Sequence, residues 1–224
     1  MKRAQQPFRF ASCMELREIL GKRAMDEARL LEIIEEAPAD SIYYHTHSYY
    51  LRHPYSQGLF PNDFATWVAL HEQDRVLGER LGVLDPFEFD DIERLRAGIV
   101  TIIADHLSHL GTIPRCTTGE PFEFVRSHVI EADLGLEAWT LRDFRDTLAG
   151  VEVGAVYNHV CEARLRKGRL SGDFVNWLSA ENGLGLPALA TQVEKVGRLG
   201  LSLEGMRARI VGLCDRTLET ASSR

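Results

Sequence analysis

The sequence predicts a mostly α-helical protein with a minor β component, made of two homologous helical repeats that each begin with a short strand. Two Phe-x-Phe segments, at Phe8 and Phe122, lie the same distance ahead of two Tyr-x-His segments, at Tyr43 and Tyr157. Two Asp-Phe-x-x-Trp segments follow in the same order, and much of the remaining sequence places apolar residues at helical spacing. The pattern indicates one duplicated unit, and we expect the copies to pack about a pseudo-twofold axis.

The repeat predicts where the chain divides. Segment 111–121 contains two glycines, two prolines and adjacent threonines, which is the composition of a loop, and it lies where one copy should end. The expected parts are a polar leader (1–7), the first repeat unit (8–110), a linker (111–121), the second repeat unit (122–214) and a C-terminal tail (215–224).

Each repeat should open with an extended segment, because Phe-x-Phe alternates as one face of a strand does. The two short strands are expected to pair near the pseudo-twofold axis. Four or five short helices should follow in each copy, since polar residues that cap helix N-termini precede the apolar stripes. The expected caps are Asp40, Asp90, Thr140 and Ser202.

Composition excludes several classes of protein. The chain has 224 residues, of which 45% are hydrophobic, and a net charge of −7. The acidic excess lies mainly in the first copy, which argues against nucleic-acid binding. No apolar run reaches the ~20 residues of a membrane span, and no signal peptide is recognisable. The four cysteines form no CxxC pair and are expected to be reduced. We therefore expect a cytoplasmic protein without a membrane partner.

The repeated histidine is the first candidate for chemistry. On a helix, His45 shares a face with Arg52, and Asp63 begins the following helix. A carboxylate beside an imidazole raises its basicity, as a general base requires, so these three are the candidate catalytic residues. The interpretation we favour is a buried His–Asp hydrogen bond that joins two helices, because buried polar side chains are normally paired for structural reasons.

The same signature occurs in both copies. A shared packing requirement explains this better than two active sites do, because the neighbouring residues differ greatly between the copies. The full repeat signature consists of His45, Asp63 and Trp67 with His159, Asp173 and Trp177.

Aromatic side chains concentrate in the first copy and could line a ligand groove, since phenols offer a flat face and a polar tip. The candidate binding residues are Tyr44, His47, Tyr49 and Tyr50. The favoured alternative is that they pack in the core, because aromatic stripes at helical spacing usually do so.

No metal site or cofactor is predicted. His45 and His47 would point to different sides of a helix, and His106 and His109 share a helical face but lack a carboxylate or cysteine at a recognisable spacing. The basic residues within 164–169 suit a helix C-terminus, and a phosphate or RNA-backbone site there is the less favoured interpretation. No phosphate-binding glycine motif occurs.

The combined order of motifs resembles an uncharacterised bacterial family, the domain-of-unknown-function family 5752. The segments that carry the resemblance are Phe8-x-Phe10, Ser41–His45, Asn62–Trp67, Tyr157-x-His159 and Asp173–Trp177. The resemblance covers nearly the whole chain and implies the tandem-duplicated helical architecture. It implies no activity, because none is established for the family. The chain departs from the family pattern mainly at 182–187.

The function predicted from these observations is non-catalytic binding or regulation, with a protein partner or a second copy of the chain. The alternative is a small-molecule enzyme or sensor for an anionic ligand, with its site in the first repeat around His45, Arg52 and Asp63.

Overall fold

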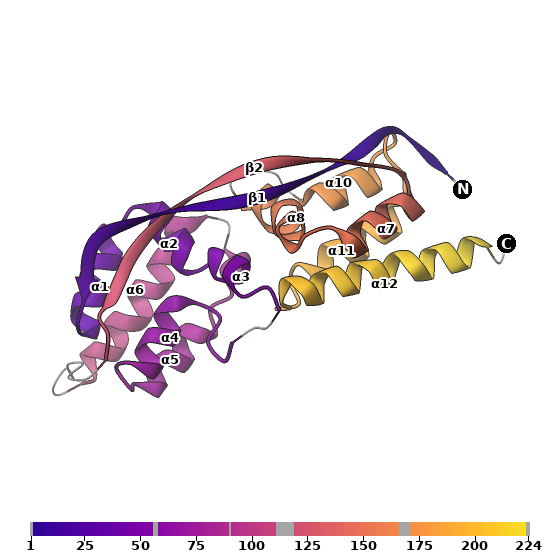
Figure 1. Ribbon diagram of the computed structural model, residues 1–224. Coiled ribbons are helices and arrows are strands. Elements are labelled where there is room, and N and C mark those ends of the chain that lie inside the picture. Colours follow the sequence, from indigo (N-terminus) through magenta and orange to yellow (C-terminus); the bar gives the residue numbers. More distant parts are fainter. Residues whose placement is uncertain (1, 56–57, 90, 111–118, 166–170, 223–224) are drawn as a thin grey trace. The chain divides into compact units, whose positions relative to one another are not determined.

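The computed structural model describes residues 2–55, 58–89, 91–110, 119–165 and 171–222 (Figure 1). They form a mostly α-helical protein with one two-stranded antiparallel sheet, which confirms the predicted fold class at this level. The chain divides into two compact units. The contiguous unit is Glu15–His128, and the composite unit combines Met1–Met14 with Val129–Arg224.

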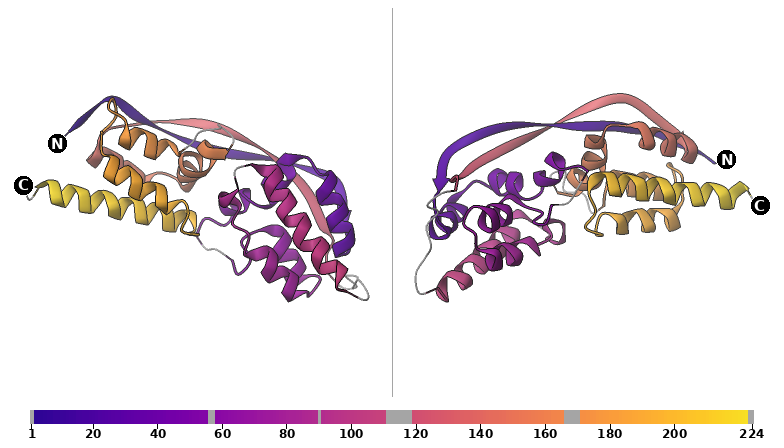
Figure 2. Two further views of the ribbon diagram at one scale, coloured as in Figure 1. Left: turned by 180° about the vertical axis from the view of Figure 1, so that it is seen from behind. Right: turned by 60° about the horizontal axis from the view of Figure 1, so that its bottom comes forward.

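The sheet pairs two long strands, β1 (Arg3–Ala24) and β2 (Phe122–Thr140). They run side by side in every view (Figures 1 and 2). At 22 and 19 residues they are much longer than the short strands predicted. The prediction underestimated them because most side chains beyond each Phe-x-Phe segment are exposed or only half-buried, so backbone pairing rather than a continuous buried apolar face defines the strand.

Both strands contain one glycine in the left-handed region. Gly21 has a φ of 69° and Gly135 a φ of 65°, values that side chains with a Cβ rarely adopt. A hypothetical Cβ at either position would meet nothing within 4 Å, so the backbone conformation and not crowding requires glycine. Such glycines inside a strand are typical of bulges that bend a β-ribbon.

Exposed ion pairs link the strands within each unit. In the contiguous unit, Arg23 contacts Glu123 and Arg126 contacts Glu18, both at 2.8 Å. In the composite unit, Arg9 contacts Glu137 at 3.2 Å. Each exposed pair contributes only about 0.2–1 kcal/mol, so their main effect is to favour one strand register.

The helices of the contiguous unit surround an apolar core. In α1 (Glu27–Glu36), Asp26 caps the N-terminus through the amide of Arg29, and Leu30, Ile33 and Ile34 form the buried stripe. The remaining elements are α2 (Ala39–His45), α3 (Ser48–Arg52), α4 (Asp63–Leu70), α5 (Arg75–Gly82), the 3₁₀ turn η1 (Pro86–Glu88) and α6 (Ile92–Ser108). Phe122 and Phe124 of β2 complete this core.

The composite unit is built in the same manner around Phe8 and Phe10 of β1. Phe10 stacks on Phe144 at 5.7 Å between ring centroids, and Phe8 lies 5.6 Å from Trp177. The helices are α7 (Leu141–Gly150), α8 (Val153–Tyr157), the π-helical turn η2 (Asn158–Glu162), α9 (Ala163–Leu165), α10 (Asp173–Ser179), α11 (Pro187–Val196) and α12 (Leu203–Ser222).

The helix caps agree only in part with the sequence. Thr140 forms the predicted capping box with Asp143, and Ser202 accepts from the amide of Gly205. Asp40 does not cap α2, because the helix begins at Ala39 and Asp40 lies in its first turn. Asp90 lies outside the described residues, and α6 is capped by Asp91.

The bounds of the two compact units differ from those of the predicted repeats, 8–110 and 122–214. The Phe-x-Phe segment that begins the predicted first repeat lies in the composite unit, among helices of the predicted second repeat. The Phe-x-Phe segment of the second repeat lies in the contiguous unit. Each helical unit therefore holds a strand segment that the sequence attaches to the other repeat. Of the predicted linker, only residues 119–121 are described.

None of the described helices is both long and apolar enough to cross a membrane.

This exchange predicts the location of a mutational effect. Phe10→Ala should cost about 3–5 kcal/mol, because it removes a fully buried ring. Hydrogen-exchange mass spectrometry should then show faster exchange in α7 and α10, and the Phe124→Ala variant should show it in α1, α4 and α6. The exposed Met14→Ala serves as the control on β1. Faster exchange in the contiguous unit on Phe10→Ala would contradict the assignment of this strand segment.

Candidate functional site

The predicted His–Asp pair of the contiguous unit holds the backbone of β2. His45, at the end of α2, lies 2.8 Å through Nδ1 from Oδ2 of Asp63 at the start of α4. Its Nε2 accepts a hydrogen bond from the amide of Val125 at 3.1 Å. Because Nε2 is the acceptor, Nδ1 carries the proton and donates to the carboxylate. A neutral histidine thus links a helix, a second helix and a strand, an arrangement we call the strand clamp.

Two further side chains bind the backbone of the same strand region. The indole of Trp67 donates to the carbonyl of Glu120 at 2.8 Å, and the hydroxyl of Ser41 donates to the carbonyl of Val125 at 2.8 Å. These hydrogen bonds pair two partly buried backbone carbonyls with side-chain donors.

The composite unit holds β1 through a second clamp of the same kind. Nδ1 of His159 lies 2.9 Å from Oδ2 of Asp173, and Nε2 accepts from the amide of Ala11 at 2.9 Å. The indole of Trp177 donates to the carbonyl of Gln6 at 2.9 Å. The six residues of the predicted signature therefore meet in two sets of three, each around one strand segment.

The surroundings of His45 favour the neutral form of its imidazole. His45 is 3% exposed, and burial lowers its pKa from the ordinary 6.5 although Asp63 opposes the shift. Burial also works against ionisation of Asp63, but His45 and Arg52 outweigh it and hold the pKa of this carboxyl below 3.8. Both imidazole nitrogens are engaged within the protein, which leaves neither one available as a general base in this conformation.

Arg52 is committed to the same network. Its Nη2 lies 2.5 Å from Oδ2 of Asp63, and its Nη1 donates to the carbonyl of Tyr44 at 2.9 Å. The guanidinium lies 4.0 Å from the centroid of the Tyr44 ring, within range of a cation–π contact. Arg166, which corresponds to Arg52 in the predicted second copy, lies outside the described residues.

The predicted binding residues around this network are buried and point to different neighbours. The exposed fractions of Tyr44, His47, Tyr49 and Tyr50 are at most 8%. His47 lies 3.1 Å through Nε2 from the carbonyl of Pro86. Tyr50 packs against Phe87, at 5.0 Å between centroids. The structure thus does not bring these four side chains together around one open groove.

An open surface depression borders each clamp. The depression of the contiguous unit has a volume of about 280 Å³ and includes Tyr44, His45, Asp63 and Trp67 in its lining. The depression of the composite unit has a volume of about 520 Å³ and is lined by Phe8, Arg9, Glu131, His159, Asp173, Asn176 and Trp177.

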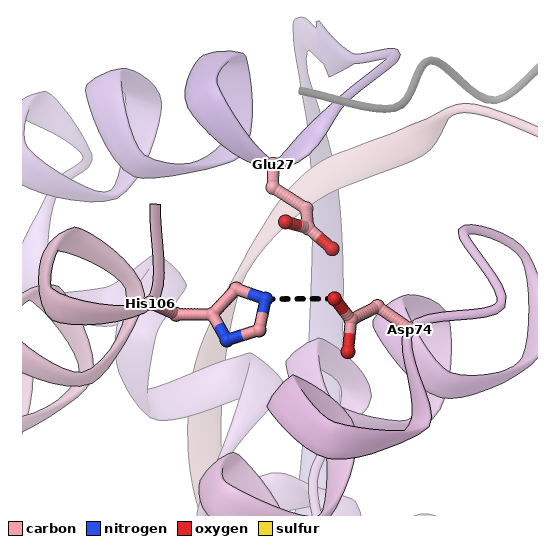
Figure 3. Close-up of side chains that lie close together, drawn as sticks. All are labelled: Glu27, Asp74 and His106. Carbon is pink, nitrogen blue, oxygen red and sulfur yellow. Dashed lines mark hydrogen bonds and ion pairs between the residues drawn. The ribbon is translucent and has the colours of Figure 1, made fainter. Parts of the chain in front are cut away.

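A further group of titratable side chains escaped the sequence analysis. Glu27, Asp74 and His106 converge inside the contiguous unit (Figure 3). Burial first, and then the charges of Asp74, Glu72 and Asp26, raise the pKa of Glu27 to about 7. The sequence contains only a weak sign of this group, because Glu27 and Asp74 occupy positions at helix starts where carboxylates are common.

The fold and the clamps define a class of mostly helical proteins in which two helical units each hold one part of a shared antiparallel β-ribbon. The chain belongs to the DUF5752 family, a family of unknown function, whose sequence profile matches residues 5–215. It is similar to the structure of OrfY from Thermoproteus tenax, with a TM-score of 0.75 and 25% identity over 96% of this chain and 97% of that chain. No curated protein matches the chain.

The clamps predict a stability effect in both units. His45→Ala and His159→Ala should each lower the free energy of unfolding by about 1–3 kcal/mol, because a partly or fully buried strand amide loses its acceptor. Denaturant unfolding measures the effect, and His109→Ala is the control because this side chain is 74% exposed. A neutral or stabilised His45→Ala beside a destabilised His159→Ala would contradict a purely structural role for His45.

The first clamp also predicts a pH dependence. Folding depresses the pKa of His45, so its contribution to stability is complete above pH 6.5 and is lost as pH falls toward the folded-state pKa. One such proton steepens the loss by at most about 1.4 kcal/mol per pH unit. We expect His45→Gln to show a shallower decrease in the free energy of unfolding below pH 6.5 than the parent. Parallel curves would show that His45 keeps an ordinary pKa in the folded chain.

Proposed function

We propose that the protein is a non-catalytic binding protein whose two helical units are receptors for extended Phe-x-Phe segments. In this proposal its own strands occupy both receptors in the free chain. The observation that carries the proposal is that side chains of the helical units bind the backbone of the strands. The clamp histidines and tryptophans bind backbone N–H and C=O groups, and two alternate phenylalanines are buried beside them.

Recognition of this kind is only weakly tied to sequence. Backbone hydrogen bonds supply affinity for any extended chain, and side-chain pockets at alternate positions supply specificity, as in other strand-binding proteins. Here the pockets accept Phe8 and Phe10 in one unit and Phe122 and Phe124 in the other. A partner protein with an accessible Phe-x-Phe segment, or a second copy of this chain, fits this chemistry.

The matched contacts support the finer architecture that we propose with this function. The clamps join equivalent positions of the two sequence copies, as expected for a tandem duplication with pseudo-twofold packing. A cytoplasmic location is part of the proposal, because the partner would be a protein segment and the three described cysteines are free thiols.

The candidate catalytic groups already contact other protein groups, which favours binding over catalysis. The nitrogens of His45 and the carboxylate of Asp63 contact one another or other protein groups, and Arg52 contacts Asp63 and Tyr44. An anionic ligand would therefore have to displace an internal carboxylate from the guanidinium. An enzyme or sensor built on these residues remains the alternative, and ligand-induced thermal stabilisation by a panel of anionic metabolites would favour it.

A labelled peptide tests the proposed receptor of the composite unit. A fluorescent peptide with the sequence of residues 3–12 should bind saturably to the Phe10→Ala variant, measured by fluorescence anisotropy. Binding to the parent should be weaker, because the tethered strand competes at a high effective concentration. A peptide with both phenylalanines replaced by alanine is the matched control.

Two variants make this test specific. Met14→Ala should behave like the parent, and a Phe10→Ala/His159→Ala double variant should bind the peptide less well than Phe10→Ala, provided that circular dichroism shows retained helix content. The proposal fails if the folded Phe10→Ala variant binds neither peptide, or binds both equally.

A further inference from the structure

We propose that Glu27, Asp74 and His106 form a binding site for a divalent transition-metal cation in the contiguous unit. The site is separate from the strand clamps and does not depend on the proposed function. One imidazole nitrogen and two carboxylate oxygens are available as ligands, and one candidate atom from each residue lies within 4.8 Å of the other two.

Three helices bring the ligands together. Glu27 is the first residue of α1, Asp74 immediately precedes α5, and His106 lies in the last turn of α6 (Figure 3). These helices belong to one unit with a common apolar core, so the ligand positions are fixed by packing rather than by a loop.

The side chain of Glu27 is the strongest sign of a missing ligand. It is 1% exposed, and among the described residues neither of its carboxylate oxygens has a hydrogen-bond partner. Figure 3 shows this carboxylate directed toward His106 and Asp74. Burial of a carboxylate without a partner is costly, and buried charges are normally paired or bound to a metal.

The other two ligands are held in position by their own contacts. Oδ1 of Asp74 accepts from the amide of Leu77 and caps α5, while Oδ2 lies 2.7 Å from Nε2 of His106. The preceding residue, Gln73, has a φ of 61°, a left-handed conformation that is uncommon outside glycine. This turn places Asp74 as both helix cap and neighbour of His106.

The charge of the cluster suits a dication. Glu27 and Asp74 would contribute two negative charges, and Glu72 and Asp26 lie close enough to add to the negative potential at Glu27. A divalent cation would neutralise the two ligand carboxylates directly.

The mixed donor set favours a transition metal. Zinc binds histidine nitrogen and carboxylate oxygen at about 2.0–2.2 Å. The more distant ligand atoms would have to approach one another, while Oδ2 of Asp74 and Nε2 of His106, now 2.7 Å apart, would have to separate to admit the ion. Imidazole suits zinc, cobalt and nickel, whereas calcium takes oxygen ligands. Three protein ligands leave further coordination positions to water.

Metal titration of the untagged full chain tests the site. After chelator treatment and dialysis, calorimetry with Zn²⁺ should show one cation per chain, and Co²⁺ should give a visible absorption band. Glu27→Gln and His106→Gln should weaken binding by at least about tenfold, since even loss of an outer-sphere partner costs about 10–100-fold. The matched controls are Glu35→Gln on α1 and His109→Gln after α6, which should bind as the parent does.

Thermal unfolding separates loss of a ligand from loss of the fold. Glu27→Gln keeps the side-chain shape and removes a buried unpaired charge, so its metal-free Tm should equal or exceed that of the parent. Added Zn²⁺ should raise the Tm of the parent and of Glu35→Gln, but have little effect on the Tm of Glu27→Gln. Absence of stoichiometric binding to the parent, or equal binding by Glu27→Gln, would overturn the proposal and indicate that a proton rather than a cation compensates Glu27.

Discussion

The structure of each unit depends on a histidine that accepts a hydrogen bond from a strand amide. A strand segment that crosses a layer of helices meets helical backbones whose N–H and C=O groups are already paired, so a side chain must complete the strand's hydrogen bonds. His45 and His159 supply the acceptor at Nε2, and a carboxylate at Nδ1 fixes the required tautomer. The Phe-x-Phe rings then add apolar contacts with the two imidazoles. Loss of the acceptor would leave the strand amide without this partner.

The two units satisfy the same backbone groups with different surroundings. The residue whose amide is clamped also has its carbonyl bound by a side chain. In the contiguous unit the hydroxyl of Ser41 donates to the carbonyl of Val125, and in the composite unit the side-chain amide of Asn158 donates to that of Ala11. In the predicted repeat alignment these donors do not occupy equivalent positions, although the carbonyls do. Strand backbone is thus the common element that both clamps contact. In the contiguous unit, Arg52 adds a cation to the clamp and neutralises a carboxylate that is already bound to histidine.

Sequence reasoning identified the parts of the clamps but not their assembly. The His–Asp pairs and the adjacent tryptophans were predictable, because the signature recurs with nearly constant spacing. The exchange of strand segments was not, because either Phe-x-Phe segment has the apolar pattern that either helical unit needs. Strand length was missed because Met14, Leu16 and Ile19 are exposed and give no alternating buried face. The cluster of Glu27, Asp74 and His106 could not be recognised, since its carboxylates resemble ordinary helix-start residues and only the packing of α1, α5 and α6 brings them together.

The proposed metal site and the strands meet where β1 becomes α1. β1 ends at Ala24, which is fully buried, and Glu27 begins the helix three residues later. A cation bound by Glu27, Asp74 and His106 would tie this junction to α5 and α6 and oppose withdrawal of the β1 segment from the contiguous unit. The clamp at His45 secures β2 within the same unit through backbone bonds that do not involve α1. The contiguous unit would then hold its two strand segments by separate means, one dependent on metal concentration and the other on the neutral state of a buried histidine.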